Sequence, residues 1–160
     1  RIFTKSSAPE ACQRCVGLWI EREWIVNKLR LEHQFKNIND THGHIIGDQV
    51  IQGVARILKK QFRREDMIAR YGGEEFLVVM ELCELRQAMI KAEKVRILIK
   101  ESMINGLEVT VSIGVAQLSA DEKDYESLVA RADTALYQAK NKGRNQCVAY
   151  TKTMKMTGSE

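Results

Sequence analysis

The sequence predicts an α+β domain in which helices pack on a mainly antiparallel sheet. Three observations support this prediction: a central hairpin of two apolar strands, helical apolar periodicity on both sides of it, and a later stretch with period-two alternation. From residue 47 the expected order is helix, hairpin, helix, strand, helix, strand. Amphipathic helices must bury their apolar faces, so we expect them to cover the sheet.

The first expected helix covers residues 47–62, where Val50, Val54 and Leu58 recur at helical spacing. Basic residues near its end suit a helix C-terminus. The remaining elements are hairpin strands at residues 67–71 and 76–80, a helix at 85–103, a strand at 107–117, a helix at 125–142 that Gly143 caps, and a strand at 147–150.

Composition indicates one globular domain with a real core. The chain has 160 residues, of which 44% are hydrophobic and 29% charged. The formal charge of +4 favours an anionic ligand only slightly. There is neither an apolar run long enough to cross a bilayer nor a secretory signal pattern, so we expect a cytoplasmic location and no membrane segment in this chain.

The four cysteines leave two interpretations open. Cys12 and Cys15 have the spacing of half a zinc site or of a redox pair. No second close pair follows, and a structural zinc ion needs four converging ligands. We therefore expect unpaired thiols at Cys12, Cys15, Cys83 and Cys147.

The hairpin turn carries two glycines and two carboxylates. Gly72 and Gly73 are expected to adopt positive φ and to leave the backbone bare, so that a phosphate can approach closely. Glu74 and Glu75 then lie at the tip, where paired acids indicate a divalent metal of the magnesium type. The alternative is a solvated turn whose charges only keep it soluble.

Several further motifs carry a resemblance to a known family. Residues 35–48 read FKNINDTHGHIIGD, residues 72–76 read GGEEF, residues 112–116 read SIGVA, and residues 131–145 read RADTALYQAKNKGRN. In this order and near this spacing, they resemble the GGDEF family of diguanylate cyclases. The resemblance covers about residues 35–150, which implies a GGDEF domain there and a C-terminal tail at 151–160. It also implies a fold similar to nucleotidyl cyclase catalytic domains and polymerase palms.

The resemblance implies condensation of two GTP molecules into cyclic di-GMP with loss of two pyrophosphates. Each domain would hold one GTP, so a homodimer would form the active unit, and no nucleic acid polymer would bind. Glu74 would bind Mg²⁺ or Mn²⁺ and help deprotonate the attacking hydroxyl, while Glu75 would support the metal and phosphate site. Gly72 and Gly73 would line the phosphates.

The resemblance also assigns residues to the nucleotide. Asn39 and Asp48 match positions that hydrogen-bond guanine, and His44 matches a substrate contact. Cationic positions near the triphosphate are matched by Lys36, Lys140 and Arg144. These assignments have ordinary alternatives. Asn39, His44 and Asp48 could be turn, cap or surface residues, and Lys140 and Arg144 could complement a helix C-terminus.

A second site is implied by Arg63 and Asp66. In the family, an Arg-x-x-Asp pattern just before the Gly-Gly turn forms an inhibitory site for the product, and these two residues have that spacing. Arginine suits a guanine face or a phosphate, and a carboxylate accepts guanine N–H groups.

The segment before residue 35 departs from the family pattern. Leu31 stands where members usually carry a metal-binding aspartate, and Glu32 is displaced by one position. Residues 24–34 instead predict a short amphipathic helix. Either the first strand has been lost or residues are missing at a join, and we favour a join because a missing central strand would leave unpaired edges. Residues 1–34 would then be a linker helix from an upstream sensory domain, or an incomplete start of the domain.

Three functional hypotheses follow, led by a diguanylate cyclase with product inhibition. The second is a catalytically silent domain that serves as a cyclic di-GMP receptor through Arg63 and Asp66, and Leu31 favours it. A cyclase acting on one purine nucleotide is the third, and the pair Asn39 and Asp48 argues against ATP. The input signal is not indicated by the sequence.

Overall fold

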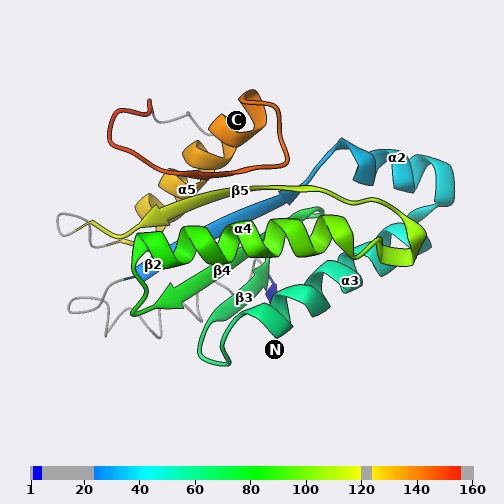
Figure 1. Cartoon of the computed structure of the whole chain (residues 1–160), viewed down its shortest axis with the longest axis horizontal. Coiled ribbons are helices and arrows are strands. Elements are labelled where there is room, and N and C mark those ends of the chain that lie inside the picture. The colour runs from blue at the N-terminus through cyan, green and yellow to red at the C-terminus, as the bar shows by residue number, and fades with distance from the viewer. Residues whose placement is uncertain (1, 5–23, 120–123, 156–160) are drawn as a thin grey trace.

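The computed structural model describes residues 2–4, 24–119 and 124–155, which form a mixed sheet with helices on both faces (Figure 1). The predicted α+β class is confirmed. The strands are β1 (Ile2–Thr4), β2 (Trp24–Leu31), β3 (Met67–Arg70), β4 (Glu75–Glu81), β5 (Val111–Gln117) and β6 (Cys147–Ala149). The helices are α2 (His33–His42), α3 (His44–Gln61), α4 (Leu85–Glu101), the short 3₁₀ helix η2 (Ile104–Gly106) and α5 (Tyr125–Asn141).

Strand β2 lies inside the sheet, between β4 and β5. The strand order is β1-β3-β4-β2-β5-β6. β2 pairs antiparallel with both β4 and β5, so that Arg30 lies opposite Glu75 on one side and Ser112 on the other. The outer pairs β1–β3 and β5–β6 are parallel. The carboxyl end of β2 therefore lies beside the β3–β4 turn.

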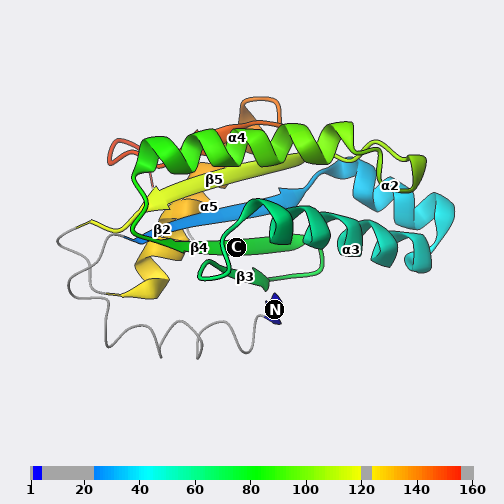
Figure 2. The same ribbon diagram turned by 60° about the horizontal axis from the view of Figure 1, so that its bottom comes forward.

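Two hydrophobic layers enclose the sheet. Helices α3 and α4 cover one face and α5 covers the other (Figure 2). The α5 layer lies very close to β5, because a Cβ atom on Gly114 would be 2.1 Å from the carbonyl oxygen of Ala132. Helix α2 and the start of α3 project beyond the end of the sheet, which leaves a recess between them and the β3–β4 turn.

The expected helix over residues 24–34 is wrong, because strand β2 occupies most of that segment. Of the two alternatives for this segment, loss of the first strand is wrong, since β2 pairs on both sides without a gap, and the favoured join stays a prediction. A central strand is buried on both faces, so apolar and polar residues do not alternate clearly along it. The division of the chain at residue 34 stays a prediction.

The other expected elements are confirmed, with some differences in bounds and number. The strand expected from residue 107 begins only at Val111, and helix α2, which carries part of the site, was not predicted. Gly143 has a φ of +116°, as expected of a residue that ends a helix.

Cys83 and Cys147 are free thiols, whereas Cys12 and Cys15 lie outside the described residues. Burial raises the pKa of Cys147 to about 12, and Glu93 acts in the same direction. Across the described ranges, no helix combines the length and the apolar character that crossing a membrane requires.

Candidate functional site

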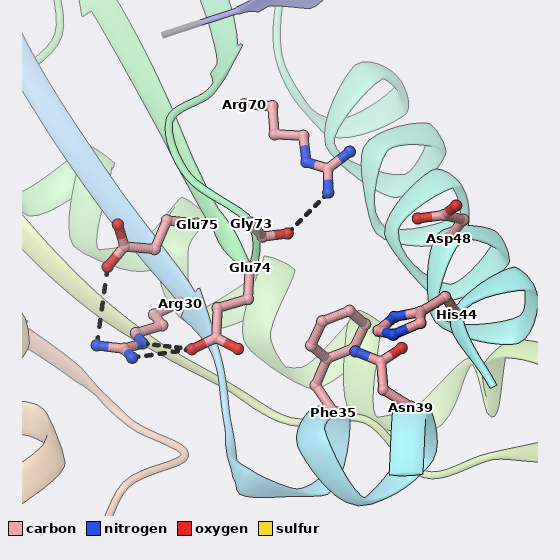
Figure 3. Close-up of a pocket in the computed structure, with 9 residues that line it drawn as sticks. All are labelled: Arg30, Phe35, Asn39, His44, Asp48, Arg70, Gly73, Glu74 and Glu75. Atoms are coloured by element: carbon pink, nitrogen blue, oxygen red, sulfur yellow. Dashed lines mark hydrogen bonds and ion pairs between the residues drawn. The ribbon is translucent and has the colours of Figure 1, made fainter. Parts of the chain in front are cut away.

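Two adjoining pockets lie where α2 and α3 meet the β3–β4 turn. Their volumes are about 610 Å³ and about 340 Å³, within the range of small-molecule sites. The larger pocket is lined by Arg30, Phe35, Asn39, His44, Asp48, Arg70, Gly73, Glu74 and Glu75 (Figure 3). The smaller is lined by Arg30, Leu31, Glu32, Lys36, Asn39, Glu74, Lys140 and Arg144. Every predicted catalytic or substrate residue except Gly72 thus lines one of the two pockets.

The helical wall of the larger pocket presents Asn39, His44 and Asp48. Gly43, with a φ of +82°, separates α2 from α3, so the chain turns sharply and side chains from both helices lie near one another (Figure 3). A Cβ atom on Gly47 would be only 1.8 Å from Asn39 Oδ1, so the amide rests directly on α3. His44 and Asp48 are exposed and make no ion pair within the described part of the chain.

The opposite wall is the β3–β4 turn, whose backbone is held from several directions. Tyr71 N–H donates to Glu75 O at 2.8 Å, and Leu31 N–H donates to Glu74 O at 3.0 Å. The Arg70 guanidinium closes the loop by donating to Gly73 O at 2.9 Å. The two turn carboxylates therefore start from a fixed backbone.

The turn glycines behave differently from expectation. Neither Gly72 nor Gly73 has a positive φ, so that prediction is wrong. A Cβ atom on Gly73 would meet nothing within 4 Å, whereas one on Gly72 would be 3.1 Å from Glu75 Oε2. Here glycine leaves the backbone open toward the pocket instead of supplying an unusual conformation.

Arg30, which the sequence did not single out, is paired with both turn carboxylates. Its Nε and Nη2 atoms each lie 2.9 Å from Glu74 Oε1, and its Nη1 lies 3.9 Å from Glu75 Oε1. A signal was present, because Lys28 and Arg30 have the period-two spacing of one strand face. The helical interpretation of this segment hid that signal.

The smaller pocket gathers basic side chains around a buried carboxylate. Glu32, whose side chain is 7% exposed, accepts a hydrogen bond from Ser112 Oγ and pairs with Arg144 Nε at 3.2 Å. Burial lowers the pKa of Lys140, and the charge of Arg30 lowers it further, although Glu75 and Glu32 oppose the shift. Lys36 is exposed at the rim. This pocket therefore suits an anion.

The metal predicted at this site fits only in part. Leu31 is 2% exposed and packs in the core, so it offers no ligand oxygen. No group of three or more His, Cys, Asp or Glu residues able to hold a metal occurs among the described residues. Glu74 and Glu75 nevertheless suit Mg²⁺, which is commonly bound by one or two carboxylates plus substrate phosphates. A bound cation would have to share these carboxylates with Arg30.

Arg63 and Asp66 lie outside both pockets, at the turn that leads into β3. The Asp66 carboxylate accepts a hydrogen bond from Arg63 N–H at 2.8 Å, and Lys91 Nζ lies 3.9 Å from it. Burial raises the pKa of Asp66, while the Arg63 hydrogen bond and the Lys91 charge oppose this shift. Lys91, which the sequence did not point to, also stacks on Phe62 with its Nζ 5.0 Å from the ring centre.

Comparisons with known proteins agree with this arrangement. The family described as "Diguanylate cyclase, GGDEF domain" matches residues 29–146. Diguanylate cyclase A of Treponema denticola is 46% identical over 116 residues, which are 70% of this chain and 31% of that protein. Response regulator PleD of Caulobacter vibrioides is 43% identical over 120 residues, 71% of this chain and 26% of that protein. The chain thus spans less than a third of these curated relatives.

Solved structures give the same result. The GGDEF domain of DgcB from Caulobacter crescentus, in complex with c-di-GMP, has a TM-score of 0.84 at 30% identity, covering 92% of this chain and 88% of that one. The active GGEEF domain of a diguanylate cyclase from Vibrio cholerae has a TM-score of 0.85 at 27% identity, with 96% and 100% covered. The matched residues include both walls of the larger pocket, and the chain belongs to the GGDEF-domain family.

Proposed function

We propose that this domain is the catalytic part of a diguanylate cyclase that condenses two GTP molecules into cyclic di-GMP and two pyrophosphates. One observation carries the proposal: Asn39 and Asp48 face the Glu74–Glu75 turn across a single pocket. A nucleotide lying across this pocket would meet a polar wall suited to a base and a charged wall suited to phosphates. A cytoplasmic location stays a prediction.

Guanine would be recognised by the helical wall. An amide and a carboxylate together offer donors and acceptors, which matches the mixed edge of guanine. Asp48 would accept guanine N–H groups, and Asn39 would bond the adjacent edge. Adenine lacks this donor pattern, so the same pair would bind ATP poorly.

The triphosphate would lie along the smaller pocket. Lys36, Lys140 and Arg144 would donate charge-assisted hydrogen bonds to its oxygens. When bound, Mg²⁺ would be held by Glu74 and Glu75 and would neutralise phosphate charge. Gly73 would let the phosphates approach the turn backbone, since its Cα carries no side chain.

Catalysis would need two domains facing each other. Each 3′-oxygen would bond to the α-phosphorus of the other nucleotide while pyrophosphate leaves, and Glu74 would help remove the hydroxyl proton. One domain holds one nucleotide and cannot align nucleophile and electrophile by itself, so a homodimer is the proposed active unit. An upstream sensory or regulatory domain is proposed to control this encounter.

Product inhibition is proposed at Arg63 and Asp66. Arg63 is exposed and able to bond a guanine or phosphate of cyclic di-GMP, and Lys91 adds a second cation beside Asp66. The solved domain of DgcB in complex with c-di-GMP supports product binding as a property of a relative.

A second candidate function is that of a catalytically silent cyclic di-GMP receptor. The observations that favour it are Leu31 at the family's metal-aspartate position and Arg30 on the turn carboxylates. Such a domain would keep the site at Arg63 and Asp66 and would make no product.

Incubation of the protein with GTP and Mg²⁺, followed by chromatography, separates the two functions. A cyclase is expected to accumulate cyclic di-GMP, and Glu74→Gln should reduce this at least about 100-fold. Glu101→Gln, an exposed carboxylate at the end of α4, is the matched control. If no product forms, and if the protein binds cyclic di-GMP in a way that Arg63→Ala abolishes, the receptor function is supported and the cyclase function is contradicted.

A further inference from the structure

The Arg30 guanidinium stands where the turn carboxylates meet the basic pocket. It lines both pockets and pairs with Glu74 through two of its nitrogen atoms. Its side chain is 41% exposed, so it remains accessible from the pocket. Strand β2 fixes its position through pairing on both sides, opposite Glu75 and Ser112.

Arginine can serve two anions at once. A guanidinium carries five N–H donors in a planar fork, and only the Nε and Nη2 groups are engaged by Glu74 at 2.9 Å. Nη1 is 3.9 Å from Glu75, beyond hydrogen-bond length. Donors therefore remain for a phosphate, and the fork geometry suits bidentate phosphate binding.

The charges of the smaller pocket favour a polyanion without help from a metal. Four basic side chains line it against two carboxylates. Glu32 is already paired with Arg144 and Glu74 with Arg30. Burial lowers the pKa of Lys140 and the charge of Arg30 lowers it further, while Glu75 and Glu32 act in the opposite direction.

We propose that Arg30 links Glu74 to the nucleotide triphosphate, and that GTP binding to this chain is consequently almost independent of divalent cations. The inference rests on the proposed placement of GTP in the two pockets. A divalent cation commonly bridges a carboxylate and a phosphate. Here the Arg30 guanidinium is already paired with the Glu74 carboxylate and also lines the smaller pocket. Leu31, which is buried and apolar, cannot supply a further metal ligand.

The test is calorimetric titration of the chain with guanosine 5′-(α,β-methylene)triphosphate, which cannot release pyrophosphate. In EDTA and in Mg²⁺ the wild-type Kd values should agree within about threefold. Arg30→Gln should weaken binding in EDTA by about tenfold or more, as expected from loss of a charge-assisted bond, and Mg²⁺ should restore much of it. Arg86→Gln, an exposed arginine at the start of α4, should match the wild type.

The outcomes separate this inference from the proposed function. Failure to bind the nucleotide in either buffer would overturn the proposed GTP site, and the inference with it. Binding that requires Mg²⁺ in the wild type would overturn the inference alone. So would an Arg30→Gln protein that binds equally well in both buffers. Should Arg30→Gln fail to fold, Arg30→Lys keeps the charge without the fork and should still show Mg²⁺ dependence.

Discussion

The two walls of the larger pocket differ in how far their charges are already satisfied. On the helical wall, His44 and Asp48 are exposed and make no ion pair within the described residues. On the turn wall, Glu74 and Glu75 are both within 4 Å of Arg30 nitrogen atoms. One wall thus presents groups without an ion pair to a ligand, whereas the carboxylates of the other wall already share the charge of Arg30.

Under the proposed function, this difference assigns base recognition to the helical wall and charge compensation to the turn wall. Unsatisfied donors and acceptors discriminate between bases, because a wrong base leaves them unpaired. A preformed ion pair gives less discrimination but keeps the carboxylates fixed before the ligand arrives. The helical wall should therefore respond to changes of base, and the turn wall to changes of ionic conditions.

Introducing the family's aspartate at Leu31 should have the largest effect, and the effect is on stability. It also tests whether the turn wall is a metal site that lacks only this carboxylate. Leu31 is 2% exposed within the core cluster that includes Leu29 and Phe35. A carboxylate there would be desolvated, so Leu31→Asp should lower the free energy of unfolding by about 3 kcal/mol or more. Urea unfolding measures this.

Leu31→Asn separates charge from size in the same experiment. It should be destabilised less than Leu31→Asp near neutral pH, and lowering the pH should narrow the gap because protonation removes the buried charge. A Leu31→Asp protein as stable as the wild type, and further stabilised by Mn²⁺, would show that the turn wall is an open metal site after all.

Removal of Asp48 should give the next largest effect, and only on the helical wall. Asp48→Ala deletes a carboxylate expected to accept guanine N–H groups, so affinity for the guanosine triphosphate analogue should fall about 10- to 100-fold. Stability should hardly change, since the side chain is exposed. Calorimetry measures this affinity, and a second titration with the corresponding α,β-methylene analogue of ATP measures the base preference.

The control for Asp48 is Asp40, an exposed carboxylate on α2 that lines neither of the two pockets. Asp40→Ala should leave the affinity unchanged within about twofold. Equal losses in both variants would mean that long-range charge, and not base recognition, sets the affinity of this wall.

The same contrast explains what the sequence could and could not predict. Asn39, Asp48 and Glu74 lie in local motifs, so their pattern was visible and their approach in space follows from a short helix pair and a hairpin. Arg30 acts through a pairing with a turn 44 residues away, which no local pattern records. The sequence of strand β2 predicts a helix instead, because burial on both faces removes the clear alternation that marks a strand.

Helix α2 was missed for a related reason. Its ten residues include Asn37, Asn39, Asp40 and Thr41, which have low helix propensity and favour turns in isolation. Phe35 and Ile38 pack into the core and stabilise the helix through tertiary contacts. The local preference was therefore overridden by packing that the sequence alone does not reveal.

Substitution of Gly47 by alanine tests the role of the helical wall by displacing the Asn39 side chain without removing it. The new Cβ atom would lie 1.8 Å from Asn39 Oδ1, so the amide must rotate away. Gly47→Ala should lower affinity for the guanosine triphosphate analogue roughly tenfold, the effect of about one lost hydrogen bond. Added to Asn39→Ala, it should cost little more, because both variants remove the same contact. Additive losses in the double variant would contradict this explanation.

Asp66, a carboxylate outside both walls, should give the smallest effect on stability. It serves as a reference for the carboxylates of the two walls. Burial raises the pKa of Asp66 above its usual value near 3.8, so the folded state binds the proton more tightly than the unfolded chain. The stability this contributes is complete below the unfolded pKa and is lost as the pH rises through the folded pKa.

Asp66→Asn keeps an oxygen that can accept the Arg63 N–H bond but never becomes charged. Relative to wild type, its free energy of unfolding should therefore rise between about pH 3.5 and pH 7, by no more than about 1 kcal/mol. Urea unfolding across this range measures the difference. A difference that stays constant with pH would mean that the Arg63 hydrogen bond and the Lys91 charge fully offset burial at Asp66, and a difference that falls with pH would mean that they outweigh it.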